Sequence, residues 1–305
     1  MGSLSTANVE FCLDVFKELN SNNIGDNIFF SPLSLLYALS MVFLGASGKT
    51  AEQLEKVLHF SHTVDPLKPG FKDSPKCSQA GRIHSEFGVL FSQINQPDSN
   101  CTLSIANRLY GTKTMAFHQG KNVTVEMMYQ IGTFKLAFVK EPQMQVLELP
   151  YVNNKLSMII LLPVGTVNLK QIEKQLNLGK FHEWTSSSNM MEREVEVHLP
   201  RFKLEIKYEL NSLLKSLGVT DLFNQVKADL SGMSPTKGIY LSKAIHKSYL
   251  DVSEEGTEAA AATGDSIAVK SLPMRAQFKA NHPFLFFIRH THTNAILFCG
   301  KLASP

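Results

Sequence analysis

Apolar residues in the first part of the chain recur at the spacing expected of helices. Between Ala7 and Leu19 they fall on one side of a helix, which predicts an amphipathic helix with one buried face. Leu33–Leu44 is apolar almost all round, so it predicts a helix buried in the core. Ser31 and Pro32 precede this stretch, and they are residue types that favour a helix cap and a first helical turn.

Two further helices are expected before the chain turns to strands. Thr50 is the expected cap of a helix that runs to about Leu58, because Gln53 follows it at the spacing of a capping box. Ala80–Ile94 predicts the next helix. Between the two, residues 59–79 are polar and contain three prolines, so they predict a long exposed loop.

From Lys121 onward the pattern changes to apolar or alternating runs of strand length, separated by glycine and proline. Helical spacing returns at Asn168–Leu176 and at Leu210–Leu217, which Gly218 ends. The expected strands are Ile28–Phe30, Thr102–Tyr110, Val123–Met128, Thr133–Val139, Gln145–Leu149, Ser157–Leu162, Glu192–Pro200, Phe202–Ile206, Gly238–Val252, Ala276–Lys279, Phe284–Arg289 and Ile296–Leu302, with breaks at Gly132, Pro142, Pro150 and Pro163. Helices early and strands later are typical of the α+β class, and residues 1–305 are expected to form a single domain.

Composition narrows the class of protein without indicating a partner. The chain has 305 residues, of which 44% are hydrophobic and 19% charged, with a formal net charge of +3. These values are typical of a soluble globular protein. Since lysine and arginine form no dense cluster, neither nucleic acid nor heparin is expected as a partner.

The N-terminus and the cysteines indicate a cytoplasmic protein. The first residues lack a basic start followed by an apolar core, and no apolar run is long enough to span a membrane. The four cysteines, Cys12, Cys77, Cys101 and Cys299, are scattered without motif spacing. That distribution favours free thiols in a reducing compartment over disulfides.

Two motifs suggest binding chemistry, but each is incomplete. Gly45–Thr50 resembles the end of a phosphate-binding loop, yet Phe43 stands where the first glycine is required, so a turn between helices is favoured. His290 and His292 share one face of a strand, but no cysteine or carboxylate nearby in sequence completes a metal site. No nucleophile, zinc or cofactor motif is present. The sequence therefore predicts no enzyme, no cofactor and no metal.

Glu254–Ser271 contains four consecutive alanines flanked by threonines. Alanine favours a helix, but the β-branched and turn-forming residues on both sides disfavour one. At a period of two, Thr257, Ala259, Ala261 and Thr263 form a small uncharged face. Such a face suits a strand that enters an already packed sheet. A flexible linker is the alternative interpretation.

Several stretches resemble the serpin family, in family order. EEGTEAAAAT, starting at Glu254, resembles the hinge of an inhibitory serpin, and FKANHPFLFFI, starting at Phe278, resembles the strand that closes the family signature. NIFFSPLSLLYALSMVFLGASGKTAEQL, starting at Asn27, resembles the second serpin helix and its continuation, and LSIANRLYG, VLELPYVNNKLSMIILLP and VEVHLPRFKLE also fit. The chain resembles an ovalbumin-type (clade B) serpin. This resemblance implies a serpin fold with a helical N-terminal part, a large mixed β-sheet and smaller β-sheets.

The resemblance also implies an exposed reactive loop, residues 254–275, that a protease attacks as bait. Counting from the hinge on the family pattern, the scissile bond is Lys270–Ser271, and a lysine there suits the acidic pocket of a trypsin-like serine protease. Arg275 is a less suitable second choice, because it lies far from the hinge. In an extended segment, the Asp265 side chain points to the same inward face as Thr257 and Thr263. Burying its carboxylate would slow insertion of the loop. The implied hinge residues are Glu254, Glu255, Gly256, Thr257, Glu258, Ala259, Ala260, Ala261, Ala262 and Thr263.

One block of the family pattern is missing at the junction Gln119–Gly120. The pattern calls there for a fifth helix, the first strand of the large sheet, the helix that covers this sheet and its third strand. The third strand is one of the two between which the loop inserts, whereas the other, Gly238–Val252, is present. We therefore expect a chain that is cut as a substrate or is non-inhibitory, and that is monomeric or prone to aggregate. A non-inhibitory binding or structural protein with a serpin fold is the alternative.

Overall fold

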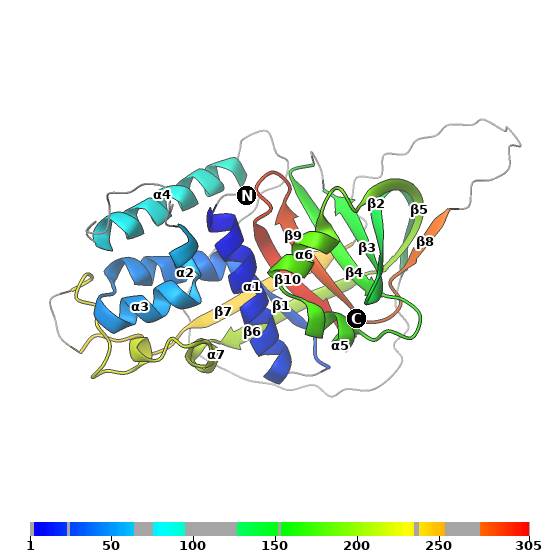
Figure 1. Cartoon of the computed structure of the whole chain (residues 1–305). Helices are drawn as coiled ribbons and strands as arrows, with labels where there is room; N and C mark the ends of the chain where they lie inside the picture. Colours follow the sequence, from blue (N-terminus) through cyan, green and yellow to red (C-terminus); the bar gives the residue numbers. More distant parts are fainter. Residues whose placement is uncertain are drawn as a thin grey trace, which may run out of the picture.

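The computed structural model describes residues 3–22, 25–63, 76–94, 127–151, 154–234, 238–253 and 275–304. Helices dominate the first part of the described chain and strands the rest (Figure 1), so the predicted α+β class is confirmed. The helices are α1 (Ser3–Asn22), α2 (Pro32–Gly45), α3 (Gly48–Val57), α4 (Lys76–Ile94), α5 (Leu169–Gln175), α6 (Leu178–Thr185) and α7 (Asn211–Leu217), with 3-10 turns η1 (Phe60–Thr63) and η3 (Asp221–Phe223).

The described strands form one sheet of eight and one of two. The large sheet has the order β1-β10-β9-β4-β3-β2-β5-β8, and only its last pair, β5 and β8, runs parallel. The second sheet pairs β6 with β7 in antiparallel fashion. The strands are β1 (Ile28–Phe30), β2 (Met127–Lys140), β3 (Gln143–Pro150), β4 (Leu156–Pro163), β5 (Met191–Pro200), β6 (Phe202–Glu209), β7 (Ile245–Val252), β8 (Ala276–Lys279), β9 (Phe284–His290) and β10 (Ile296–Leu302).

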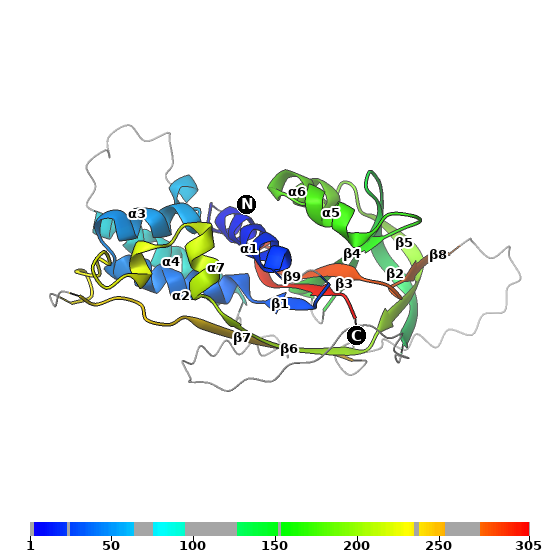
Figure 2. The ribbon, with the colours of Figure 1, turned by 90° about the horizontal axis from the view of Figure 1, so that it is seen from below.

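The large sheet is covered on both faces, which explains why its central strands β4 and β9 are almost entirely apolar and buried. One face packs against the helices, where residues such as Phe11 of α1 join Phe287 of β9 in one core. The other face packs against the two-stranded sheet, where Phe202 of β6 joins Phe286 in a second core. Figure 2 shows this layering, with β6 and β7 on one side of the large sheet and α1, α5 and α6 on the other.

Three strand predictions match the structure at their bounds, and others need correction. Ile28–Phe30, Ala276–Lys279 and Ile296–Leu302 are β1, β8 and β10. The predicted break at Gly132 is wrong, because Gly132 pairs with Val195 inside the continuous strand β2. A side chain at position 132 would meet the ring of Phe134 at 3.0 Å, so the glycine leaves room for that ring.

The expected loop at residues 59–79 is shorter than predicted. Phe60–Thr63 forms a 3-10 turn in which Phe60 is fully buried, and helix α4 begins at Lys76 rather than at Ala80. Residues 64–75 lie outside the described part of the chain. The expected strand Gly238–Val252 is also shorter, since pairing begins only at Ile245.

The predicted capping box at Thr50 is wrong. Helix α3 begins at Gly48, and its cap residue Ser47 makes no side-chain cap hydrogen bond. The Thr50 hydroxyl instead accepts a hydrogen bond from the backbone N–H of Asp229 at 3.0 Å. The Gln53 amide accepts hydrogen bonds from the backbone N–H groups of Thr220 and Asp221. Contacts with distant segments have therefore replaced the local cap.

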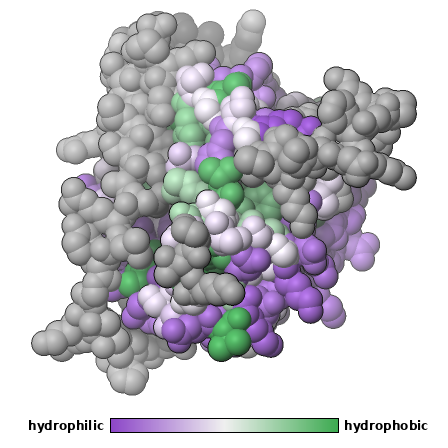
Figure 3. All heavy atoms as spheres, turned by 90° about the vertical axis from the view of Figure 1, so that its left-hand side faces the viewer, coloured by the Kyte–Doolittle hydropathy of each residue, from purple (hydrophilic) through white to green (hydrophobic). Residues whose placement is uncertain are grey.

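The helical end of the molecule exposes several apolar side chains. Figure 3 views this end and shows apolar residues gathered in the middle of the face among hydrophilic ones. Exposed apolar residues of the elements found there are Met41 and Leu44 of α2, Val89 of α4, and Val226 and Met233 of the segment before β7. Helix α2 is therefore buried on most sides, as predicted, but not all round.

Candidate functional site

The structure describes both attachment points of the candidate reactive loop. Strand β7 ends at Val252, Ser253 follows, and the next described residue is Arg275, immediately before β8. The two attachment points belong to different sheets, because β7 pairs with β6 and β8 pairs with β5. The hinge residues Glu254–Thr263 and the bond Lys270–Ser271 lie outside the described residues, so their positions remain predictions.

The N-terminal attachment point is a strand with one hydrogen-bonded neighbour in the described part of the chain. Residues 245–252 of β7 pair one for one with residues 209–202 of β6. On the outward face, ion pairs join the two strands, such as Lys203 with Asp251 at 2.9 Å and Lys247 with Glu205. No described strand pairs with the opposite edge of β7.

The inward face of β7 carries a buried polar cluster that the sequence analysis missed. The ring Nε2 of His246 accepts a hydrogen bond from the backbone N–H of Ser31 at 3.0 Å, and the Ser248 hydroxyl lies 2.8 Å from the same nitrogen. The Ser31 hydroxyl donates to the carbonyl of Leu297 at 2.8 Å and accepts from the N–H of Ser34. The cluster thereby joins β7 to the start of α2 and to β10.

Burial lowers the pKa of His246 to about 4. The imidazole is therefore neutral at physiological pH, which agrees with its role as a hydrogen-bond acceptor. Since the residues involved lie more than 200 positions apart in sequence, no local motif could have indicated this cluster.

The C-terminal attachment point is held by backbone pairing, one ion pair and one buried ring. Strand β8 pairs in parallel with residues 195–198 of β5, and the Phe278 side chain is fully buried. Arg275 donates from Nε to Glu194 Oε1 at 2.9 Å. The Ala280 N–H donates to the carbonyl of His198 at 2.9 Å and extends the attachment by one residue.

These contacts concern Arg275, the second candidate bait residue. A serine protease binds several residues on both sides of the scissile bond in an extended form, so cleavage after Arg275 would require β8 to leave the sheet. The Arg275 guanidinium is also engaged by Glu194. Lys270 lies several residues before β8 in sequence and outside the described residues.

The other candidate motifs have structural roles. The turn from Gly45 to Thr50 is filled by the chain itself, because the Ser47 N–H donates to the Asp229 carbonyl and the Gly232 N–H donates to the Gly45 carbonyl, both at 3.0 Å. The carbonyl of Asp229 therefore occupies the Ser47 amide, and the neighbouring segment packs against the turn. Among the described residues, no group of three or more histidines, cysteines and carboxylates is arranged to hold a metal ion.

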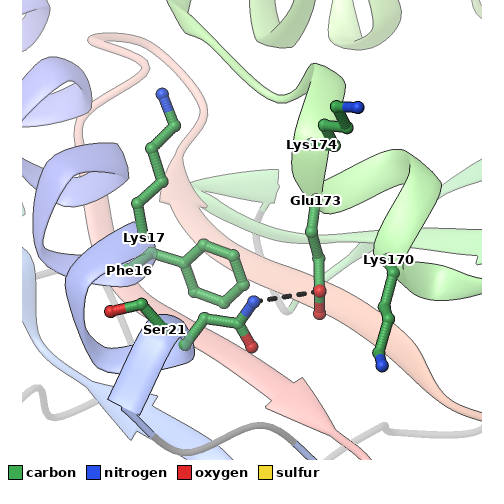
Figure 4. Close-up of a pocket in the computed structure, with 7 residues that line it drawn as sticks. Phe16, Lys17, Ser21, Lys170, Glu173 and Lys174 are labelled. Carbon is green, nitrogen blue, oxygen red and sulfur yellow. Dashed lines mark hydrogen bonds between the residues drawn. The ribbon is translucent and has the colours of Figure 1, made fainter.

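A small cleft lies between α1 and α5, with a volume of about 230 Å³. At its floor, Glu173 accepts a hydrogen bond from the Asn20 amide at 2.9 Å and pairs with the buried Lys301 at 3.3 Å. Figure 4 shows the rim residues Lys17, Lys170 and Lys174 pointing away from one another. The arrangement ties β10 to two helices and does not gather positive charge on one ligand.

Cys12 of α1 and Cys299 of β10 are both free and fully buried. Burial, followed by the neighbouring Cys299, raises the pKa of the Cys12 thiol well above its ordinary value. Such a thiol is unreactive at physiological pH. None of the described helices is long and apolar enough to cross a membrane.

Comparison with known proteins defines the class. The family model described as "Serpin (serine protease inhibitor)" matches residues 6–120 and 111–305, so the chain belongs to the serpin family, which comprises protease inhibitors rather than enzymes. Within that family it is an ovalbumin-type (clade B) serpin, similar to Serpin B11 of Homo sapiens (74% identical over 392 positions) and of Mus musculus (50%), with the whole of each chain covered.

Solved structures agree with this assignment. Uncleaved ovalbumin superposes with a TM-score of 0.78 at 29% identity, with both chains fully covered. A structure described as a tumour suppressing serpin gives a TM-score of 0.75 at 28% identity, again over the whole of both chains. The predicted serpin fold, with helices and a large mixed sheet, is confirmed.

Proposed function

We propose that this chain is a serpin-type scaffold that presents the Lys270–Ser271 bond to trypsin-like serine proteases and is cleaved there without trapping them. The observation that carries the proposal is the arrangement of the loop attachments. A segment of 21 residues, 254–274, joins the end of β7 to Arg275, in front of β8. Its lysine suits a protease pocket with an acidic floor.

We infer that the chain does not trap proteases because, among the described strands, β7 has a hydrogen-bonded partner on one edge only. Trapping requires the loop to insert as a strand beside β7, between two neighbours that supply hydrogen bonds to both of its edges. β7 offers one such edge, and no second acceptor strand is found in the described part of the chain. Asp265 would also face inward on insertion, and burying an unpaired carboxylate opposes that step.

The comparisons support a missing block near Gln119–Gly120. The family model matches in two pieces that meet at residues 111–120. The alignment with human Serpin B11 runs over 392 positions although this chain has only 305 residues, so part of that relative has no counterpart here. We infer that the acceptor strand belongs to the missing part.

The test is limited proteolysis with a trace of trypsin, followed by mass spectrometry of the first product and a denaturing gel. We expect the first cut after Lys270, no gel-stable covalent complex, and no rise in melting temperature after cleavage. Lys270→Ala should remove the first cut, whereas the matched variant Arg275→Ala should leave it. A covalent complex, or a large rise in melting temperature, would overturn the loss of trapping.

A non-inhibitory binding or structural protein with the serpin fold is the second candidate. Among the described strands, β7 pairs with β6 alone, and this favours the second candidate, because a sheet without a second acceptor strand cannot take up the loop. It predicts that Lys270 is cut no faster than other exposed lysines. For either candidate we expect a cytoplasmic protein, since buried free thiols such as Cys12 and Cys299 suit a reducing compartment.

A further inference from the structure

An open pocket of about 540 Å³ lies where the end of α4 meets the turn after β9. The β9–β10 turn and the adjacent end of α4 can be followed in Figure 1. The pocket is separate from the loop attachments, and nothing in the proposed function uses it. Its lining residues are Gln93, Asn154, Lys155, His290, Thr291 and His292.

The Lys155 ammonium is the unusual feature of this pocket. Its Nζ atom is buried and has no hydrogen-bond partner. The backbone fixes the residue in place, because the Thr291 N–H donates to the Lys155 carbonyl at 2.8 Å. A buried ammonium without a counter-charge is strongly unfavourable, and in native proteins such a group usually marks the place of a bound ion or water.

Among the described residues that line the pocket, no carboxylate accompanies Lys155. His290 is 4% exposed, and its ring Nδ1 lies 2.9 Å from the Thr293 hydroxyl. Burial lowers the pKa of His290 first, and the charges of His292 and Lys155 lower it further. The described lining from α4 is the neutral Gln93, and the nearby Arg289 is directed to Glu148 instead.

We propose that this pocket binds a small divalent oxyanion, such as sulfate or a phosphate group, with the Lys155 ammonium as its main partner. The anion supplies the missing counter-charge and accepts hydrogen bonds from Lys155. The side chain of His290 strengthens binding when it is protonated, and Gln93 and Asn154 offer neutral donors at the rim. The volume admits an oxyanion together with bound water.

Sulfate is the probe of choice because its charge does not change between pH 5 and pH 8. Protonation of His290 as the pH falls adds positive charge to the pocket. Sulfate affinity should therefore be higher at pH 5.5 than at pH 8. Calorimetric titration with sodium sulfate, at an ionic strength held constant with sodium chloride, separates binding from general screening.

Lys155→Met is the decisive variant, and Lys140→Met, at the exposed end of β2, is its matched control. Lys155→Met should weaken sulfate binding about tenfold or more, since it removes a charge-assisted hydrogen bond, whereas Lys140→Met should not change it. Without sulfate, Lys155→Met should be at least as stable as the wild type, because it removes an unpaired buried charge.

Three results would overturn the proposal. The first is a wild-type protein that does not bind sulfate at pH 5.5, and the second is a Lys155→Met variant that binds it as tightly as the wild type. The third is acetate bound as tightly as sulfate, because it would remove the assignment to a divalent anion. None of these measurements depends on how the chain responds to a protease, so the outcome is independent of the proposed function.

Discussion

The side-chain amide of Asn8 in α1 hydrogen-bonds both backbone polar groups of Ile296 in β10. The Ile296 N–H donates to Asn8 Oδ1 at 2.6 Å, and Asn8 Nδ2 donates to the Ile296 carbonyl at 3.3 Å. Asn8 is fully buried, and the two residues are 288 positions apart. The pair therefore fixes the first helix of the chain to its last strand.

Replacing Asn8 by alanine should lower the free energy of unfolding by about 2–4 kcal/mol, because two buried backbone groups lose their partner. Urea denaturation followed by circular dichroism measures the change. Asn22→Ala is the control, since the Asn22 amide bonds only within the exposed end of the same helix and should cost less than about 1 kcal/mol. Equal losses in the two variants would contradict this role for Asn8.

Gly300 of β10 lies between the stacked rings of two phenylalanines. It pairs with Phe29 of β1 on one side and with Phe286 of β9 on the other, and these rings are 6.1 Å apart. A Cβ at position 300 would lie 2.2 Å from the fully buried Phe286 ring. Gly300→Ala should therefore destabilise the protein by about 1–3 kcal/mol or more.

Gly81→Ala is the matched control for this substitution. Gly81 is exposed in α4, and a Cβ there meets nothing within 4 Å. The change should stabilise the protein by about 0.5–1 kcal/mol through helix propensity. Thermal melting of both variants gives shifts of opposite sign, and a neutral Gly300→Ala would show that the Phe286 ring can move aside.

The spacing of a capping box occurs at two helix starts, and the two outcomes show how far the fold can be predicted from local sequence. Asn168 and Gln171 have the spacing of a capping box, and both of its hydrogen bonds form at the start of α5. Thr50 and Gln53 have the same spacing, but distant backbone groups engage both side chains instead. Local propensity therefore predicts an element well where no tertiary contact competes for the same polar groups.

Other elements gave weak signals or none. Helix α6 (Leu178–Thr185) is short, has a glycine as its second residue, and buries Phe181 and Trp184. At the site, the bait segment follows from family resemblance. The Ser31–His246 hydrogen bond and the Arg275–Glu194 ion pair join residues far apart in sequence, so only the fold could bring them together.

The buried His246 should make the protein sensitive to acid. Its pKa falls from about 6.5 in the unfolded chain to about 4 in the fold, so between these values the unfolded state binds the extra proton. Stability is full above pH 6.5 and falls as the pH drops toward 4, by up to about 3 kcal/mol. Burial also lowers the pKa values of His182 and His290, which act in the same direction.

Urea midpoints at pH 7.5 and pH 5 test this linkage. His246→Asn removes the titrating group and keeps a hydrogen-bond acceptor for the Ser31 N–H, so its midpoint should change less with pH than that of the wild type. His282→Asn is the control, because His282 lies in an exposed segment. An unchanged pH dependence in His246→Asn would assign the acid sensitivity to other groups.

Arg289 of β9 and Glu148 of β3 form a buried ion pair at 3.0 Å, with side chains 8% and 7% exposed. Burial raises the pKa of Glu148, but the charge of Arg289, hydrogen bonds from Ser157 and Arg289, and the charge of Lys135 together lower it below its ordinary value. The pair therefore stabilises the fold at neutral pH, and this contribution is lost as acid protonates Glu148.

Arg289→Met should cost about 3–5 kcal/mol, because it leaves the Glu148 carboxylate buried with only Lys135, 3.6 Å away, as a counter-charge. The double variant Arg289→Met with Glu148→Leu should recover most of that loss, since no buried charge then remains. Lys180→Met, which breaks an exposed pair with Glu183, is the control and should cost less than about 0.5 kcal/mol. If the double variant were as unstable as the single one, packing around Arg289 rather than the unpaired charge would account for the loss.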